Sequence, residues 1–431
     1  MPGAGGSWAA PANWDTASVP NAIGAAVFFT SPTAARTVTN DSGAAGFTVG
    51  SLSFDITANL SNSLTTGTAG SNLKLNNGGA GVTITTSGGG TANNSISVAL
   101  VFNDSVTAIV NQTSATSGAG SLNITSAITG SGGFTKLGDG LATFGTGTKT
   151  FTGPMVISGG RMRSSLLAAP TGTSGLTINA GGQLTLITTG SYTFGSNPMK
   201  LNGNGATSVP FSVFPGAIRN DTNVAVTINN QVVLESNTLL HVEGTATGSL
   251  TFPNAISGAG SLTLAAPSSS ANQGQLVLGG GNSYMGGTFV NGGTLVASGS
   301  GASFGAGDVT VNNALSPAST AKLTIQTGVL NAIADTATLS LAGGGTIGLA
   351  DNNYIELQNG VNEFVSALLL GGVPQAFGTY GSTASGATFQ NDEYFSGPGV
   401  VTVVPEPGAA VMLLGGIGTL LGLRRRNSRR A

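Results

Sequence analysis

Two stretches of the chain repeat each other and decide the predicted fold: residues 128–135 read ITGSGGFT, and residues 256–263 read ISGAGSLT. Downstream of each, a second block repeats as FTGPMVISGGRM at 151–162 and as YMGGTFVNGGTL at 284–295. The second copy carries five extra residues between its blocks, around 267–272. Internal periods of 20–50 residues are typical of solenoids and arrays. We therefore take 128–162 and 256–297 as the clearest copies of a repeated architecture.

Short apolar segments bounded by glycine indicate which solenoid this is. Examples are LVL at 276–278, TFV at 288–290 and VTV at 309–311. Gly-Gly and Asn-Gly pairs separate many of them and supply positive φ without steric cost. We predict an all-β parallel β-helix, with Leu, Ile, Val and Phe inward and Thr, Ser and Asn outward. At about 22 residues a rung and ~4.8 Å between rungs, the rod would be roughly 85 Å long. An antiparallel sandwich is the second choice, because Asn-Gly pairs also form hairpins.

The end of the chain, 405–431, is a segment of a different kind. Pro405, Glu406 and Pro407 precede an apolar run from Ala409 to Leu423. Five arginines follow it: Arg424, Arg425, Arg426, Arg429 and Arg430. As a helix, 408–423 would span ~24 Å at ~1.5 Å per residue, slightly less than a hydrocarbon core of about 30 Å. Because the cytoplasmic flank of a membrane helix carries the positive charge, the arginines predict that residues 424–431 lie on the cytoplasmic side. We divide the chain into a β-helical region, 1–404, and a single hydrophobic helix with its flanks, 405–431.

This tail resembles the PEP-CTERM sorting signal of bacteria with a Gram-negative-type envelope. The resemblance covers the whole tail, from Pro405-Glu406-Pro407 to the arginine cluster. It implies an exosortase-type membrane protease or transpeptidase as a partner. It also implies a precursor held in the inner membrane by the helix, then delivery to the cell surface or the extracellular polymer. The alternative is a C-terminal anchor helix that is never processed.

The start of the chain does not match that expectation. Its first six residues, MPGAGG, have neither the basic nor the apolar region of a signal peptide. We expect the natural start to lie upstream. The alternative is that the tail inserts after synthesis and that the rest of the chain stays inside the cell.

The region 276–297 closely resembles the autotransporter-associated β-strand repeat found in passenger regions of bacterial surface proteins. The residues that carry the resemblance are GNSYMGGT at 281–288 and NGGTL at 291–295. The copy at 151–162 is degraded, because Pro154 and Met155 replace the usual Gly-Thr. The stretches 8–14 and 351–404 look like the ends of such passengers. The family implies an exported surface protein.

Composition excludes several classes of protein. Only 7% of the residues are charged, against about 25% in a usual soluble domain. Hydrophobic residues make up 40%, which is enough for a core, and cysteine is absent, so no disulfide framework exists. Residues 1–404 hold nine Lys and Arg against fifteen Asp and Glu, a net charge of −6. Nucleic acid is therefore not expected as a partner.

Candidate catalytic residues are few. His241 is the only histidine, and strand alternation places it on the same face as Glu243. A catalytic reading makes His241 a base that Glu243 orients; we favour an exposed strand-face pair. The acids are scattered, whereas glycoside cleavage needs two of them about 5–10 Å apart. The pair Asp392-Glu393 is interpreted as an end loop, and the stretch around Lys149 lacks the glycine of a phosphate loop. We predict no catalytic, cofactor or metal residues.

Two functional hypotheses follow. The first is an exported structural or adhesive protein of the cell surface or extracellular matrix. It would bind extracellular polysaccharide or other copies of itself, since unpaired strand edges at the rod ends favour further pairing. The second is a β-helix lyase or hydrolase acting on extracellular polysaccharide. A groove lined by two or three acids with Arg or Lys would favour the second.

Overall fold

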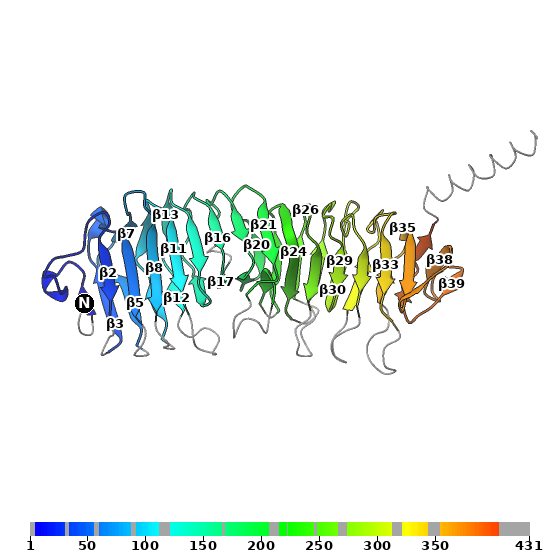
Figure 1. The fold of residues 1–431 in the computed structure, drawn as a ribbon, viewed down its shortest axis with the longest axis horizontal. Coiled ribbons are helices and arrows are strands. Elements are labelled where there is room, and N and C mark those ends of the chain that lie inside the picture. Colours follow the sequence, from blue (N-terminus) through cyan, green and yellow to red (C-terminus); the bar gives the residue numbers. More distant parts are fainter. Residues whose placement is uncertain are drawn as a thin grey trace, which may run out of the picture.

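The chain forms an elongated rod of short stacked strands (Figure 1). This computed structural model describes residues 5–30, 34–55, 60–87, 92–111, 121–165, 169–206, 215–221, 223–244, 248–265, 274–312, 321–343 and 354–404. The hydrophobic helix predicted within 405–431 lies outside the described residues. Across the ranges just given, no helix is long and apolar enough to span a membrane.

Three stacks of parallel strands run along the rod. Sheet 1 contains β1 (Gly5–Ser7), β3 (Arg36–Asn40), β6 (Asn62–Thr66), β9 (Asn94–Ile96), β12 (Leu122–Ile124), β15 (Leu141–Phe144), β17 (Gly160–Ser164), β19 (Gly182–Leu186), β22 (Ile218–Asn220), β24 (Val232–Val242), β27 (Leu262–Ala265), β29 (Thr288–Val290), β31 (Val309–Val311), β33 (Thr338–Leu341) and β36 (Ala367–Leu370). Sheet 2 contains β2 (Ala26–Phe29), β5 (Ser51–Asp55), β8 (Val82–Ser87), β11 (Val106–Val110), β14 (Phe134–Leu137), β16 (Met155–Ile157), β18 (Leu176–Ile178), β21 (Met199–Gly203), the first part of β24, and β26 (Ile256–Gly258).

The third stack consists of two separate sheets, together called sheet 3. Its first part contains β4 (Phe47–Val49), β7 (Asn72–Leu75), β10 (Ala99–Phe102) and β13 (Ile128–Gly130). Its second part contains β20 (Gly190–Tyr192), β23 (Ala225–Ile228), β25 (Ser249–Phe252), β28 (Gln275–Leu278), β30 (Gly293–Ala297), β32 (Ala321–Ile325), β34 (Ile355–Leu357) and β40 (Phe395–Ser396).

One turn of the chain shows how the sheets are built. The chain passes through β10, β11 and β12, and the next turn passes through β13, β14 and β15. Each strand of the second turn pairs in parallel with its counterpart in the first: β13 with β10, β14 with β11, β15 with β12. This is the arrangement of a parallel β-helix, so the predicted all-β class and the parallel pairing are confirmed. The antiparallel sandwich was the wrong alternative.

The rungs vary in length, although a single repeating length was predicted. Phe144 pairs with Ser164 on the next rung, whereas Leu186 pairs with the much more distant Asn220. The paired strand segments stay short, so the extra residues lie in the connections between strands. Surface connections tolerate such insertions at little cost, because closure entropy grows slowly with length.

Two ends differ from the regular stack. At the N-terminal end lie the short 3-10 helices η1 (Pro11–Asn13) and η2 (Gly43–Ala45). There the Trp8 and Trp14 rings meet edge to face at 4.9 Å between centroids, and Trp8 is fully buried. At the C-terminal end, β35 (Asn362–Val365), β41 (Val400–Val403), β38 (Gly378–Gly381) and β39 (Phe389–Gln390) form a small fourth sheet. Among the described strands, the antiparallel pairs are β38 with β41 and β36 with β37 (Val373–Pro374).

Side chains alternate between the interior and the surface as predicted. On β5 and β25, for example, every second residue is buried. Some amides point inward as well: Asn62 and Asn94 are buried on neighbouring rungs, and the Asn62 Nδ2 donates to the Asn94 Oδ1 at 3.1 Å. This bond satisfies the Asn62 Nδ2 and the Asn94 Oδ1, which would otherwise be costly to bury. The prediction that Asn points outward is therefore wrong for Asn62 and Asn94, whose amide pair lies in the interior.

Candidate functional site: a buried polar cluster

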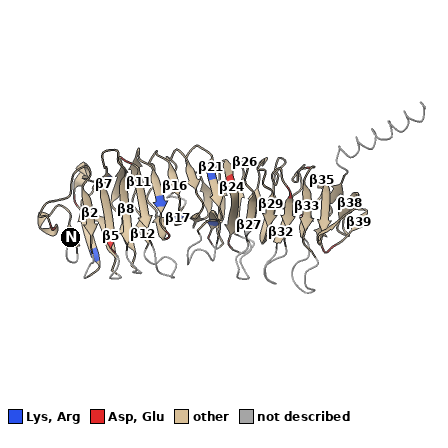
Figure 2. Cartoon of the chain, in the orientation of Figure 1, with Lys and Arg blue, Asp and Glu red and all other residues tan. Residues whose placement is uncertain are grey.

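Charged residues are sparse along the described rod, and Figure 2 shows most of its strands without any. One exposed pair joins neighbouring rungs of sheet 2, where the Lys200 Nζ on β21 lies 2.9 Å from the Glu235 Oε1 on β24. A second group of charges, on β17, β22 and β24 of sheet 1, contains the histidine singled out above. This second group is the candidate site.

His241 lies in a column of polar residues on the outward side of sheet 1. Strand pairing aligns Arg163 on β17 with Thr185 on β19, then with Arg219 on β22 and His241 on β24. The alternating inward positions hold apolar side chains such as Leu240, which pairs with Ile218. The sequence pattern therefore predicted the correct face for His241.

The prediction that His241 and Glu243 form an exposed pair was wrong. His241 is fully buried and Glu243 is 4% exposed. All five residues of β19 are buried, so both faces of sheet 1 are covered here. Gly216 supplies part of the cover, because a Cβ added there would lie 3.0 Å from the His241 Cβ. The Gln183 Nε2 also donates to the Gly216 carbonyl at 3.0 Å.

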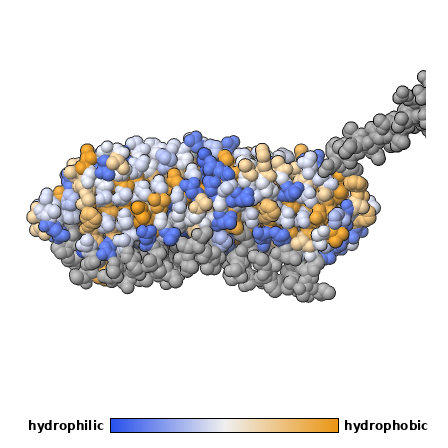
Figure 3. Space-filling view, in the orientation of Figure 1, coloured by the Kyte–Doolittle hydropathy of each residue, from blue (hydrophilic) through white to orange (hydrophobic). Residues whose placement is uncertain are grey.

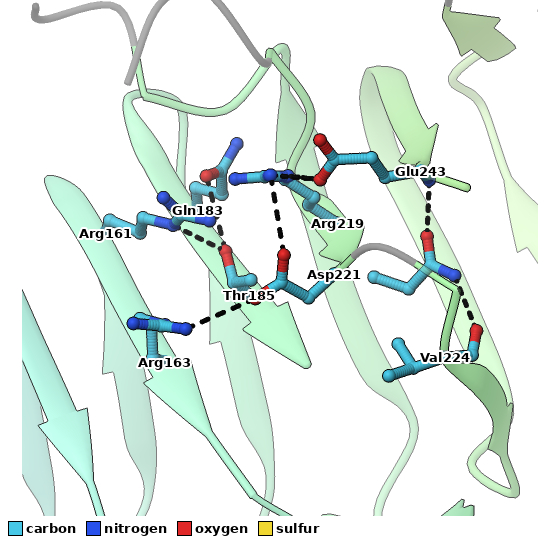
Figure 4. Close-up of polar contacts among 9 residues, drawn as sticks. Arg161, Arg163, Gln183, Thr185, Arg219, Asp221, Val224 and Glu243 are labelled. Atoms are coloured by element: carbon cyan, nitrogen blue, oxygen red, sulfur yellow. Dashed lines mark hydrogen bonds and ion pairs between the residues drawn. The ribbon is translucent and has the colours of Figure 1, made fainter. Parts of the chain in front are cut away.

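Arg219 is the centre of the cluster (Figure 4). Its Nε donates to the Glu243 Oε2 at 2.9 Å, and its Nη2 contacts the same oxygen. The Nη2 lies 3.7 Å from Asp221 Oδ1, and the other Asp221 oxygen pairs with the Arg163 Nη2 at 3.2 Å. Asp221 thus links the guanidinium groups of Arg163 and Arg219, and Glu243 pairs with Arg219. A buried pair of this kind is costly to break, because one charge would be left without its partner.

Further hydrogen bonds hold the cluster in position. The Arg161 Nε donates to the Thr185 Oγ1 at 2.8 Å. The Asn220 side chain accepts from the Glu243 backbone N–H at 2.7 Å and donates to the Val224 carbonyl at 2.9 Å. Glu243 is therefore anchored both through its own main chain and through Arg219.

Burial changes the protonation chemistry of the cluster. It lowers the pKa of the His241 imidazole to about 3, and the charges of Arg219 and Arg161 add to this lowering. Burial also lowers the pKa of the Arg161 guanidinium to about 9, with Arg219 and Arg163 adding to the effect. At neutral pH His241 is a neutral, covered side chain. Its position beside a Glu243–Arg219 ion pair fits a structural role in sheet 1.

Two buried lysines form a second kind of polar site, inside the rod. Lys136 faces the interior, and its Nζ donates to the carbonyls of Leu137, Gly138 and Gly159 at 2.8, 2.7 and 3.1 Å. Burial lowers the pKa of Lys136 to about 7. Sequence reasoning missed this lysine, although its place two residues after Phe134 in an alternating strand was the available signal.

Lys149 is the residue considered above for a phosphate loop, and it is also buried. Its Nζ donates to the carbonyls of Ser126, at 2.8 Å, and Gly147, and lies 5.3 Å from the centre of the Phe144 ring. Burial lowers the pKa of Lys149 to about 8. The ammonium group thus satisfies carbonyls at a turn of the rod.

The remaining candidate residues lie apart from this cluster. Asp392 and Glu393 are exposed near the C-terminal end, and the Asp392 carboxylate accepts from the Thr383 N–H and hydroxyl at 2.7 and 2.8 Å. Within the described ranges, no three His, Cys, Asp or Glu side chains come together as a possible metal site. The sorting residues Pro405, Glu406 and Pro407 and the arginines at 424–426, 429 and 430 lie outside the described residues.

Two segments of the chain are similar to a known repeat family. Residues 134–163 and 271–297 match the family described as the passenger-associated-transport-repeat. The first segment covers β14 to β17, and the second includes β28 to β30. These segments overlap both predicted repeats, so the resemblance to autotransporter-associated β-strand repeats is confirmed. No curated protein and no solved structure matches the chain. The repeats indicate a secreted or surface protein of the passenger type.

Proposed function

We propose that this protein is a non-enzymatic rod of the cell surface or extracellular matrix, which an exosortase-type system sorts through its C-terminal tail. The observation that carries the proposal is the repeat match at 134–163 and 271–297 within one parallel β rod. A solenoid of this kind offers a long, stiff body whose connections can vary without disturbing the core. Extracellular polysaccharide or further copies of the rod are the proposed partners.

The sorting step is supported by the order of features in the tail. Pro405-Glu406-Pro407 stands next to an uncharged apolar run, and five arginines follow that run. In the proposed sequence of events, the helix first anchors the precursor in the inner membrane, and processing at the motif then releases the rod to the cell surface or the medium.

Changing the motif tests the sorting proposal. The variant Pro405→Ala/Glu406→Ala/Pro407→Ala is compared with the wild type in a host that carries an exosortase, and membrane, surface and medium fractions are probed for the rod. The matched control is Asn427→Ala/Ser428→Ala, which alters the same tail but keeps the motif and the arginines. We expect the motif variant to stay in the membrane and the control to be released. Normal release of the motif variant would refute sorting through Pro405-Glu406-Pro407.

The absence of enzymatic activity is also a proposal. It is supported by the burial of His241 and by the engagement of Glu243 with Arg219. Full-length protein incubated with neutral and acidic polysaccharides is expected to release neither reducing ends nor unsaturated products. Turnover that disappears in His241→Ala would establish the alternative, a β-helix lyase or hydrolase.

A further inference from the structure

The C-terminal end of the rod exposes large apolar side chains. Val373 and Phe377 are 61% and 63% exposed, and Phe389 is 44% exposed. Val373 is on β37, Phe377 directly precedes β38, and Phe389 is on β39, the edge strand of the fourth sheet. These strands form the end of the rod in Figure 1, and Figure 3 shows apolar surface at the same end.

The described chain ends beside one of these side chains. In the antiparallel pair of β38 and β41, Gly378 lies opposite Val403. Continuing this register by one residue places Phe377 beside Val404. The Val404 N–H donates to the Val365 carbonyl at 3.1 Å, so Val404 still belongs to the fold. The described chain therefore ends at the exposed apolar end of the rod.

The connection from this end to the apolar run is short. The four residues Pro405 to Gly408 separate Val404 from Ala409. Five fully extended Cα steps reach roughly 17 Å at ~3.3–3.6 Å each. The interfacial layer on one side of a bilayer is about 5–7 Å thick, from ~40–45 Å of total thickness and a ~30 Å core. With 409–423 in a membrane, Phe377 is within reach of the interface.

We propose that, in the anchored precursor, the C-terminal end of the rod docks on the membrane surface through Phe377 and Val373, with Phe389 beside them. This inference rests on the proposed anchoring of the tail. Apolar and aromatic side chains bind the boundary between headgroups and acyl chains. The short tether keeps their local concentration high, so a small contact suffices. Asp392 and Glu393 are exposed on the same terminal part of the chain, so a zwitterionic surface is favoured over an anionic one.

The experiment uses full-length chain in vesicles of phosphatidylcholine. The native sequence has no cysteine, so a single introduced cysteine can carry a fluorescent label. Ala376→Cys places the label next to Phe377, and Ala22→Cys places it at the opposite end of the rod; both positions are exposed. Lipids with a spin label at headgroup depth quench a fluorophore only when it lies at the interface. We expect strong quenching at position 376 and little at position 22.

Phe377→Ser in the Ala376→Cys chain is the decisive variant. Its matched control is Phe28→Ser, since Phe28 on β2 is 58% exposed at the other end. The ratio of docked to undocked rods is expected to fall about tenfold for Phe377→Ser, as for one well-buried phenyl group, and to stay unchanged for Phe28→Ser. Circular dichroism checks that both variants keep their β structure.

Three results would overturn the proposal. Equal quenching of the label in Ala376→Cys chains with and without Phe377→Ser, when both sediment with the vesicles, shows that Phe377 does not dock the end although the tail anchors. Failure of the wild type to sediment with vesicles refutes the anchoring itself and the docking with it. Efficient disulfide cross-linking of two unlabelled Ala376→Cys chains, lost when Phe377→Ser is added, identifies a second copy of the rod as the partner instead of lipid.

Discussion

Acidification is expected to destabilise the rod around β22 and β24, because His241 must take up a proton inside a buried polar cluster. The pKa of His241 is about 3 in the fold, against an ordinary value of 6.5. Between these values the native state binds fewer protons than the unfolded state. Stability that is present at neutral pH is therefore lost as the pH falls below 6.5.

The magnitude follows from the difference between the two pKa values. Each pH unit below 6.5 lowers the free energy of unfolding by up to ~1.36 kcal/mol, so at pH 4 it is lower by ~3 kcal/mol. The imidazole is fully buried, so solvent does not screen it. Arg219 and Arg161 oppose the added charge. Glu243 is already paired with Arg219, and Asp221 with Arg163, so both carboxylates of the cluster are engaged before an imidazolium ion forms.

Amide hydrogen exchange measures this loss locally. Protection factors are compared between pH 7 and pH 4 for the amides of Ile218–Asn220 and Thr238–Val242, in the wild type and in His241→Gln. Because the chain has one histidine, the difference between the two pH profiles isolates the imidazole. Protection factors convert to a free energy of local opening. Between pH 7 and pH 4 we expect this free energy to fall by ~3 kcal/mol more in the wild type than in His241→Gln. An equal loss of protection in the wild type and in His241→Gln would refute the role of the imidazole.

Three further predictions concern other buried groups. Glu243→Gln is expected to lower the free energy of unfolding by about 3 kcal/mol, because the Arg219 charge loses its principal partner. Glu356→Gln breaks a partly exposed pair with Lys322 and should lower the free energy of unfolding by under about 1 kcal/mol. Denaturant titrations measure both variants, and equal losses for Glu243→Gln and Glu356→Gln would contradict the prediction. Lys136, with a pKa of about 7 in the fold against 10.5, should make stability rise by up to ~5 kcal/mol between these pH values, since the native state binds fewer protons there. In Lys136→Met that rise should be smaller but not absent, because the pKa of Lys149 is also lowered, to about 8; a rise of unchanged size would argue against Lys136 as a cause. Trp8→Ala should cost about 3–5 kcal/mol through the cavity left in the N-terminal end, with a thermal melt as the measurement; a change under about 1 kcal/mol would show that the ring is dispensable.

The repeat pattern predicted the fold class because it is a local property of the chain. Short apolar strands bounded by glycine pairs must pair with equivalent strands on neighbouring turns. The spacing of the copies at 128–162 and 256–297 was enough to predict a solenoid. The same alternation placed His241 and Glu243 on one side of their strand. The rung lengths could not be predicted as well, because residues in surface connections obey no such pattern.

The sequence by itself determined the all-β class, the parallel stacking, the interior of Leu, Ile, Val and Phe, and the scarcity of charge. Each of these depends on residue type and spacing along the chain. Only the tertiary structure decided that the outward face around His241 is covered, that Arg219 pairs with Glu243 across neighbouring rungs, and that Lys136 is bound by main-chain carbonyls. These features depend on which turns lie side by side and on what covers them. The contacts of Arg219 with Glu243, of Gln183 with Gly216 and of Lys136 with Gly159 join residues more than 20 positions apart along the chain, and no local pattern encodes them.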